Sequence, residues 1–108
     1  MNPIHRDLAA GRWHTLSLFE QLGNIGSEVS RAHRAKEAGN RDRMMKALER
    51  GLELFDLTIA DPRHRTRLRE ICRAREVVCD YFYGDNEYRS TGESLVKYFD
   101  AYARAARR

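Results

Sequence analysis

Three short helix-breaking signals divide this chain into segments that share one pattern. They are Gly39-Asn40, Asp61-Pro62 and Gly84-Asp85-Asn86. Between them, apolar residues recur every three or four positions, which places them on one face of a helix. The first such segment starts at Gly11. The chain is therefore predicted to form four amphipathic helices, joined by turns too short for a long crossover.

Two of the helix starts carry recognisable caps. Asp61 supplies an N-cap directly before Pro62, a proline at the first helical position, which predicts the start of the third helix. Ser90 followed by Glu93 matches a capping box and predicts the start of the fourth.

Composition supports an all-α fold. Ala, Leu, Glu, Lys and Arg make up 51 of the 108 residues, whereas Val, Ile and Thr, which favour strands, make up 12. We predict an antiparallel up-down-up-down four-helix bundle over residues 11–108, preceded by an N-terminal arm over residues 1–10. No apolar run is long enough to span a membrane, and the N-terminus lacks the apolar core of a signal peptide, which predicts a cytoplasmic protein.

Basic residues are concentrated in the third helix. The chain has 20 Lys plus Arg against 16 Asp plus Glu, and residues 62–75 contain six arginines and one acid. Helical spacing turns Arg65, Arg69 and Arg73 outward together, and Arg63 and Arg67 lie on a flank. This arginine stripe predicts a surface that binds the phosphates of RNA or DNA. The alternative is a solvated face balanced by acids of a neighbouring helix, and the chain alone leaves both open.

Arg75 has a different direction from the rest of the stripe. Its position falls between apolar residues of the third helix, so we expect it to point inward. A buried guanidinium needs a carboxylate partner, and Glu20, Glu28 and Asp56 are the candidates.

A strip of small residues along the first helix predicts a close contact with another backbone. Gly23, Ser27 and Ser30 belong to this strip, and each glycine inside a helix needs such a reason because it costs up to about 1 kcal/mol against alanine. The contact comes either from this bundle or from a second subunit. Trp13 points away from the apolar stripe, and Leu16 lies beside it. These five residues are our predicted interface for a homo-oligomer.

The pattern of potential ligands argues against a metal, a cofactor or a catalytic site. No histidine lies four positions from another, and no Cys-x-x-Cys occurs. Glu53 and Asp56 form a Glu-x-x-Asp element like that of helical magnesium-dependent nucleotide pyrophosphohydrolases. The Glu-Glu-x-x-Glu run that would accompany it is missing, so this enzyme is the less favoured alternative.

Several runs of the chain resemble a family of small bacterial helical proteins, and the likeness extends over about residues 9–105. The runs are GRW at 11–13, LSL at 16–18, EQLGNIGSEV at 20–29, LELFDLT at 52–58 and REVVCD at 75–80. In size, basic charge and helical plan these proteins resemble the accessory variability determinant of diversity-generating retroelements. They also resemble the proteins encoded in 23S rRNA intervening sequences.

This resemblance implies a function without catalysis. It implies a ring-shaped homo-oligomer, typically a pentamer, that binds a reverse transcriptase and its template RNA and supports mutagenic cDNA synthesis. We therefore expect a basic, self-associating bundle that binds nucleic acid, a reverse transcriptase, or both. The alternative from a different class is a protein-interaction module with no affinity for nucleic acid.

Overall fold

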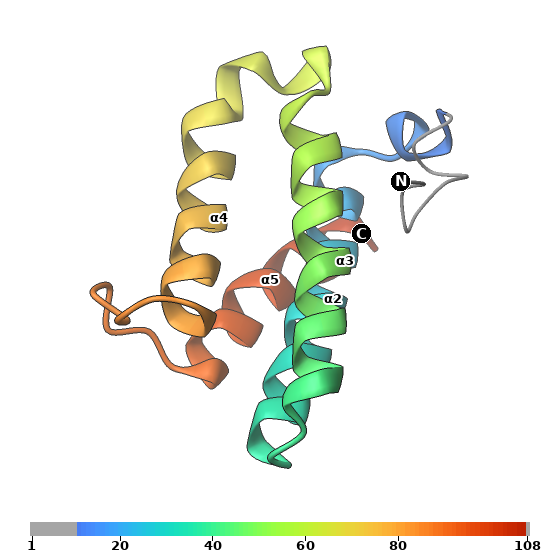
Figure 1. The fold of residues 1–108 in the computed structure, drawn as a ribbon. Coiled ribbons are helices and arrows are strands. Elements are labelled where there is room, and N and C mark those ends of the chain that lie inside the picture. Colours follow the sequence, from blue (N-terminus) through green and yellow to red (C-terminus); the bar gives the residue numbers. More distant parts are fainter. Residues whose placement is uncertain (1–10, 108) are drawn as a thin grey trace.

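Four α-helices pack together in the computed structural model, which describes residues 11–107 (Figure 1). The predicted arm over residues 1–10 lies outside the described residues. The α-helices are α2 (Leu18–Glu37), α3 (Arg41–Ile59), α4 (Leu68–Phe82) and α5 (Gly92–Ala106), and two 3₁₀ helices, η1 (Arg12–Thr15) and η2 (Pro62–Arg67), accompany them. No strand occurs within this range, so the all-α prediction is confirmed there.

Helix α2 is the centre of the packing. It contacts both α3 and α5 along much of its length, whereas α4 packs against α3. In Figure 1, α3 and α4 stand side by side, and α5 runs obliquely between the lower end of α4 and α2. Gly26 of α2 is what lets α5 come so near, because a Cβ at that position would lie 2.4 Å from Cβ of Phe99.

The turn between α2 and α3 follows the sequence signal closely. Gly39 adopts φ 73°, a left-handed conformation that favours glycine, and ends α2. The Asn40 side chain then accepts a hydrogen bond from the Arg43 amide and caps α3. This short connection brings the C-terminal half of α2 next to the N-terminal half of α3.

Two helix starts differ from the prediction. The first helix does not begin at Gly11: a 3₁₀ turn comes first, and α2 begins only after Ser17, which forms a capping box with Glu20. The third helix begins after Asp61 as expected, but its first six residues are 3₁₀, with non-helical dihedral angles at His64. A buried side-chain hydrogen bond accompanies each 3₁₀ helix, from Trp13 of η1 to Thr58 and between His64 of η2 and Gln21.

The start of the fourth helix is also shifted. The capping box is formed by Thr91 and Ser94, not by Ser90 and Glu93. The reason is the preceding turn, where the Asn86 side chain accepts from the Ser90 amide and donates to the Ser90 carbonyl. These bonds hold Ser90 inside the loop.

Within residues 11–107, no helix is both long enough and apolar enough to cross a membrane.

Candidate nucleic-acid interface

Two basic grooves lie on either side of α2. One, of about 560 Å³, separates α2 from α3, and the other, of about 480 Å³, separates α2 from α5. Arg31 and Arg34 line both grooves, so they form a ridge between them. The basic residues of the two grooves are Arg31, Arg34, Arg43, Lys46, Arg50, Arg104 and Arg107. We call this surface the α2 face.

The α2 face follows from helical spacing in three elements. Arg43, Lys46 and Arg50 are three and four positions apart, so they share one side of α3. Arg104 in the last turn of α5 and Arg107 at its C-cap are three apart. The hairpin of α2 and α3 and the crossing of α5 bring these sets to the same ridge.

Glu28 fixes two of the arginines. Its side chain is buried and accepts hydrogen bonds from Arg31 and, at 2.8 Å, from Nε of Arg50. One carboxylate thus orients a guanidinium from α2 and another from α3. Charge-assisted hydrogen bonds of this kind restrict the two side chains, which both remain partly exposed.

The other cations of the face are mostly available to a ligand. Lys46 pairs with Asp42 at 3.4 Å, a contact between two exposed side chains. Arg34, Arg43, Arg104 and Arg107 form no ion pair with any residue in the part of the chain that the structure describes. Among residues 11–107, Asp100 is the one acid that lines either groove. The excess of guanidinium groups suits a polyanion, and phosphates are the anions that arginine binds with two parallel hydrogen bonds.

The three outward arginines of the predicted stripe are exposed, and one of them contacts a tyrosine ring. Arg65, Arg69 and Arg73 face solvent, as the spacing predicted. Arg73 stacks on the Tyr88 ring at 4.9 Å. Arg65 belongs to η2, whereas Arg69 and Arg73 belong to α4, so the stripe crosses a break in the helix.

The two flanking arginines of the stripe are held by nearby acceptors. Arg63 donates to Asp61 at 2.6 Å and to the Leu16 carbonyl at 2.7 Å. Arg67 donates to Glu70 at 3.0 Å. Phosphate would have to compete with these partners at both positions.

Arg75 is less buried than predicted. Its side chain is 37% exposed, and its partner is Asp56, with Nε 3.3 Å from Oδ1. Asp56 is therefore the partner among the three candidates, and Glu28 serves Arg31 and Arg50 instead. The expectation that Arg75 points inward is met in part, because Nε is buried and makes no hydrogen bond, whereas the side chain as a whole is partly exposed.

Trp13 is buried, so the expectation that its side chain lies on an exposed face is wrong. It is 1% exposed, and its Nε1 donates to Thr58 of α3 at 3.0 Å. Gly23 and Gly26 serve the packing of α5 within the chain: a Cβ at Gly23 would lie 3.1 Å from Cα of Ala103. Leu16 is half-buried, and Ser27 and Ser30 line the groove between α2 and α5.

A buried polar cluster joins η1, α2 and η2. Asp61 is 2% exposed and accepts from Arg63 and from the buried Gln21. His14 Nδ1 lies 3.2 Å from the same carboxylate, and Gln21 Oε1 accepts from Nε2 of His64 at 2.9 Å. The Arg63 guanidinium holds the pKa of Asp61 well below its usual range, whereas burial lowers the pKa of His64.

The Glu-x-x-Asp element formed by Glu53 and Asp56 has no third ligand beside it among residues 11–107. Asp56 is exposed and paired with Arg75, and Glu53 lies one turn before it on α3. Within residues 11–107, the only group of three or more ligand-type side chains close enough to share a cation is His33, Glu37 and Glu93. That group lies at a different place, where the end of α2 meets the start of α5.

No family model, curated protein or solved structure matches this chain. The functional proposal therefore rests on the charge and the grooves of the α2 face. The sequence did hold a signal for the α2 face, since Arg31 and Arg34 lie three apart opposite the apolar stripe. The rest of the face could not be predicted, because its arginines come from three separate segments that meet only in the folded chain.

Proposed function

We propose that this protein is a non-catalytic helical bundle that binds nucleic acid through the α2 face. The observation that supports this most is the convergence of seven basic side chains from α2, α3 and the end of α5 on two adjoining grooves, where Asp100 is the one lining acid among the described residues. Neutralising phosphates with arginine and lysine releases counterions, which is the main source of affinity for RNA and DNA.

The exposed part of the arginine stripe is the second proposed contact. Arg65, Arg69 and Arg73 face solvent without a carboxylate partner in the range that the structure describes. They come from one edge of the molecule, whereas the α2 face offers two grooves. We therefore rank the α2 face first.

The resemblance of this sequence to the accessory variability determinants of diversity-generating retroelements supports more specific proposals. We propose template RNA and a reverse transcriptase as partners, a ring-shaped homo-oligomer as the assembly, and the cytoplasm as its location. We also keep the up-down-up-down order of the helices as part of this proposal.

Binding of fluorescent single-stranded RNA and duplex DNA at several salt concentrations tests the proposal. The parent should bind, and its affinity should fall with salt by a log–log slope of roughly 0.7 per phosphate contact on single strands and about 0.9 on duplex. A triple variant Arg34→Gln, Arg43→Gln, Arg104→Gln should reduce that slope by about 2 on RNA, since it removes three guanidinium groups that form no ion pair among the described residues.

The matched control is Arg65→Gln, Arg69→Gln, Arg73→Gln, which removes the same charge from the stripe. It should reduce the slope less than the first triple variant. Equal loss from both would make the two surfaces one extended interface. If the parent binds neither RNA nor DNA at low salt, the proposal is wrong and the protein-interaction module takes its place.

A further inference from the structure

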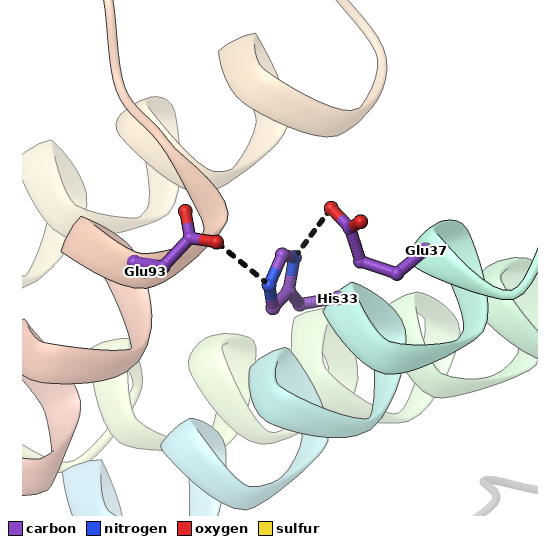
Figure 2. Close-up of side chains that lie close together, drawn as sticks. All are labelled: His33, Glu37 and Glu93. Atoms are coloured by element: carbon purple, nitrogen blue, oxygen red, sulfur yellow. Dashed lines mark ion pairs between the residues drawn. The ribbon is translucent and has the colours of Figure 1, made fainter.

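His33 lies between two carboxylates at the junction of α2 and α5 (Figure 2). Its side chain is 14% exposed. Nδ1 is 3.9 Å from Oε1 of Glu37, one helical turn further along α2, and Nε2 is 3.7 Å from Oε1 of Glu93 in the first turn of α5. Both distances are longer than a hydrogen bond, so neither carboxylate is a hydrogen-bond partner of the ring.

The backbone of α5 is shaped around this imidazole. A Cβ at Gly92 would lie 2.0 Å from both Nδ1 and Cε1 of His33. Only glycine therefore allows the first turn of α5 to pack directly on the ring. This packing fixes the ring beside Glu93, which follows Gly92 in the chain.

One ring nitrogen is buried without a partner. Nδ1 of His33 is inaccessible to solvent and makes no hydrogen bond. Buried polar atoms in folded proteins nearly always have a partner, and an exception calls for an explanation such as an ion that binds there. Two carboxylates facing one imidazole would attract a cation of that kind.

The side chains are close enough to share one ion. One ligand atom from each of His33, Glu37 and Glu93 lies within 4.8 Å of the other two. Two ligands about 2.1 Å from a tetrahedral zinc ion are about 3.4 Å apart, which is close to the 3.9 Å between Nδ1 of His33 and Glu37. Glu93, which lies 3.7 Å from Nε2, has to turn toward the Nδ1 side of the ring to share the same ion. Glu37 and Glu93 are exposed and free to make that adjustment.

We propose that His33, Glu37 and Glu93 bind one divalent transition-metal ion of the zinc class. An imidazole favours zinc, nickel or copper over magnesium and calcium, and two carboxylates add the negative charge that stabilises a dication. Water completes the coordination on the solvent side. The ion links the end of α2 to the start of α5, and this site shares no residue with the α2 face.

Titration calorimetry with zinc chloride on chelator-treated full-length protein tests the proposal. We expect one ion per chain and a rise in Tm of at least about 5 °C at saturating zinc, because the ion binds the folded chain only. Magnesium chloride at the same concentration should leave Tm unchanged. Glu37→Gln and Glu93→Gln should each weaken zinc binding at least tenfold, and both side chains are exposed enough to be replaced without unfolding the protein.

Two controls separate this site from other zinc ligands. His14→Gln changes the other described histidine that is partly exposed next to a carboxylate, and Cys72→Ser removes an exposed thiol. Neither should alter the affinity or the stoichiometry. In long-range ¹H–¹⁵N spectra, zinc should shift the ring nitrogens of His33 and leave those of His64 in place.

The proposal is overturned if zinc does not bind at 100 μM, or if both glutamate variants bind it as tightly as the parent. It is also overturned if the spectra place the ion on another histidine. None of these results depends on RNA or DNA, so this proposal and the proposed function can fail separately.

Discussion

Asp61 shows how a single buried carboxylate organises one end of the molecule. It caps η2, accepts from Arg63 and Gln21, and lies beside His14, so it connects η1, α2 and the turn after α3. The 3₁₀ geometry of η2 and the break after η1 both accommodate these contacts. A buried charge is costly to leave without its donors, so a change at Asp61 should disturb the contacts of all three segments.

Asp61→Asn should lower the free energy of unfolding by about 1–3 kcal/mol at pH 7. Asparagine keeps the N-cap, so the change isolates the charge, and the half-exposed Arg63 keeps the loss below that of a fully buried pair. Urea unfolding monitored by circular dichroism measures the difference. An unchanged midpoint would show that the carboxylate adds nothing beyond its cap.

The pH dependence of the free energy of unfolding should reveal the protonation of two residues of this cluster, His64 and Asp61. The pKa of His64 is lowered by burial, so the parent should lose stability as the pH falls below about 6.5, where the unfolded chain takes up the proton first. The lowered pKa of Asp61 adds a second loss below about pH 3.9. In Asp61→Asn the second loss should become smaller while the first remains; part of it persists because hydrogen bonds also lower the pKa values of Glu20 and Glu70. A variant profile identical to that of the parent below pH 4 would contradict this assignment.

At the scale of the elements, the crossing of α2 and α5 depends on glycine at one position. Gly26→Ala should destabilise the protein by about 1–3 kcal/mol, because its Cβ would lie 2.4 Å from Cβ of Phe99. Gly51→Ala is the matched control in α3, since its Cβ meets only Glu28 Cβ at 3.4 Å. That variant should be neutral or more stable by up to about 1 kcal/mol. Thermal unfolding compares them, and equal effects would contradict the close approach.

The elements could be predicted where the signal is local. Gly39 and Asn40 end and start helices in the structure as they do in the sequence pattern, since both act through their own backbone or side chain. The cap of α5 could not be placed to the residue, because the choice between Ser90 and Thr91 depends on the Asn86 turn. Trp13 was misjudged because its partner, Thr58, lies 45 positions away.

At the scale of the whole molecule, the candidate site could not be predicted from the sequence for the same reason: its residues are far apart in the chain. The arginine stripe is contiguous in the chain and so was visible, whereas the α2 face combines residues 31–34, 43–50 and 104–107. Apolar side chains, in contrast, lie together between α4 and α5. A groove of about 290 Å³ there has mainly apolar walls that include Val77, Leu95 and Tyr98. Apart from the basic α2 face, the molecule thus has an apolar groove, which also has Glu70 and Arg73 in its walls.

This separation bears on the predicted self-association. Ser27 and Ser30 of the predicted interface line the same groove as Arg31, Arg34 and Arg104. A two-fold contact through that strip would bring the arginines of two copies together, and like charges in an interface are destabilising. The groove between α4 and α5 carries no such excess of charge. We therefore expect copies to associate through that groove and to leave the α2 face open.

Light scattering coupled to size-exclusion chromatography measures the outcome. The parent should give a mass of at least two chains of 12.6 kDa each at micromolar concentration. Val77→Glu, which places a charge in the apolar groove, should reduce the mass to that of one chain. Ser30→Glu should leave the mass unchanged but weaken RNA binding, because a carboxylate there competes for Arg34. If Ser30→Glu dissociates the oligomer and Val77→Glu does not, the strip is the interface, and a parent of 12.6 kDa would contradict self-association altogether.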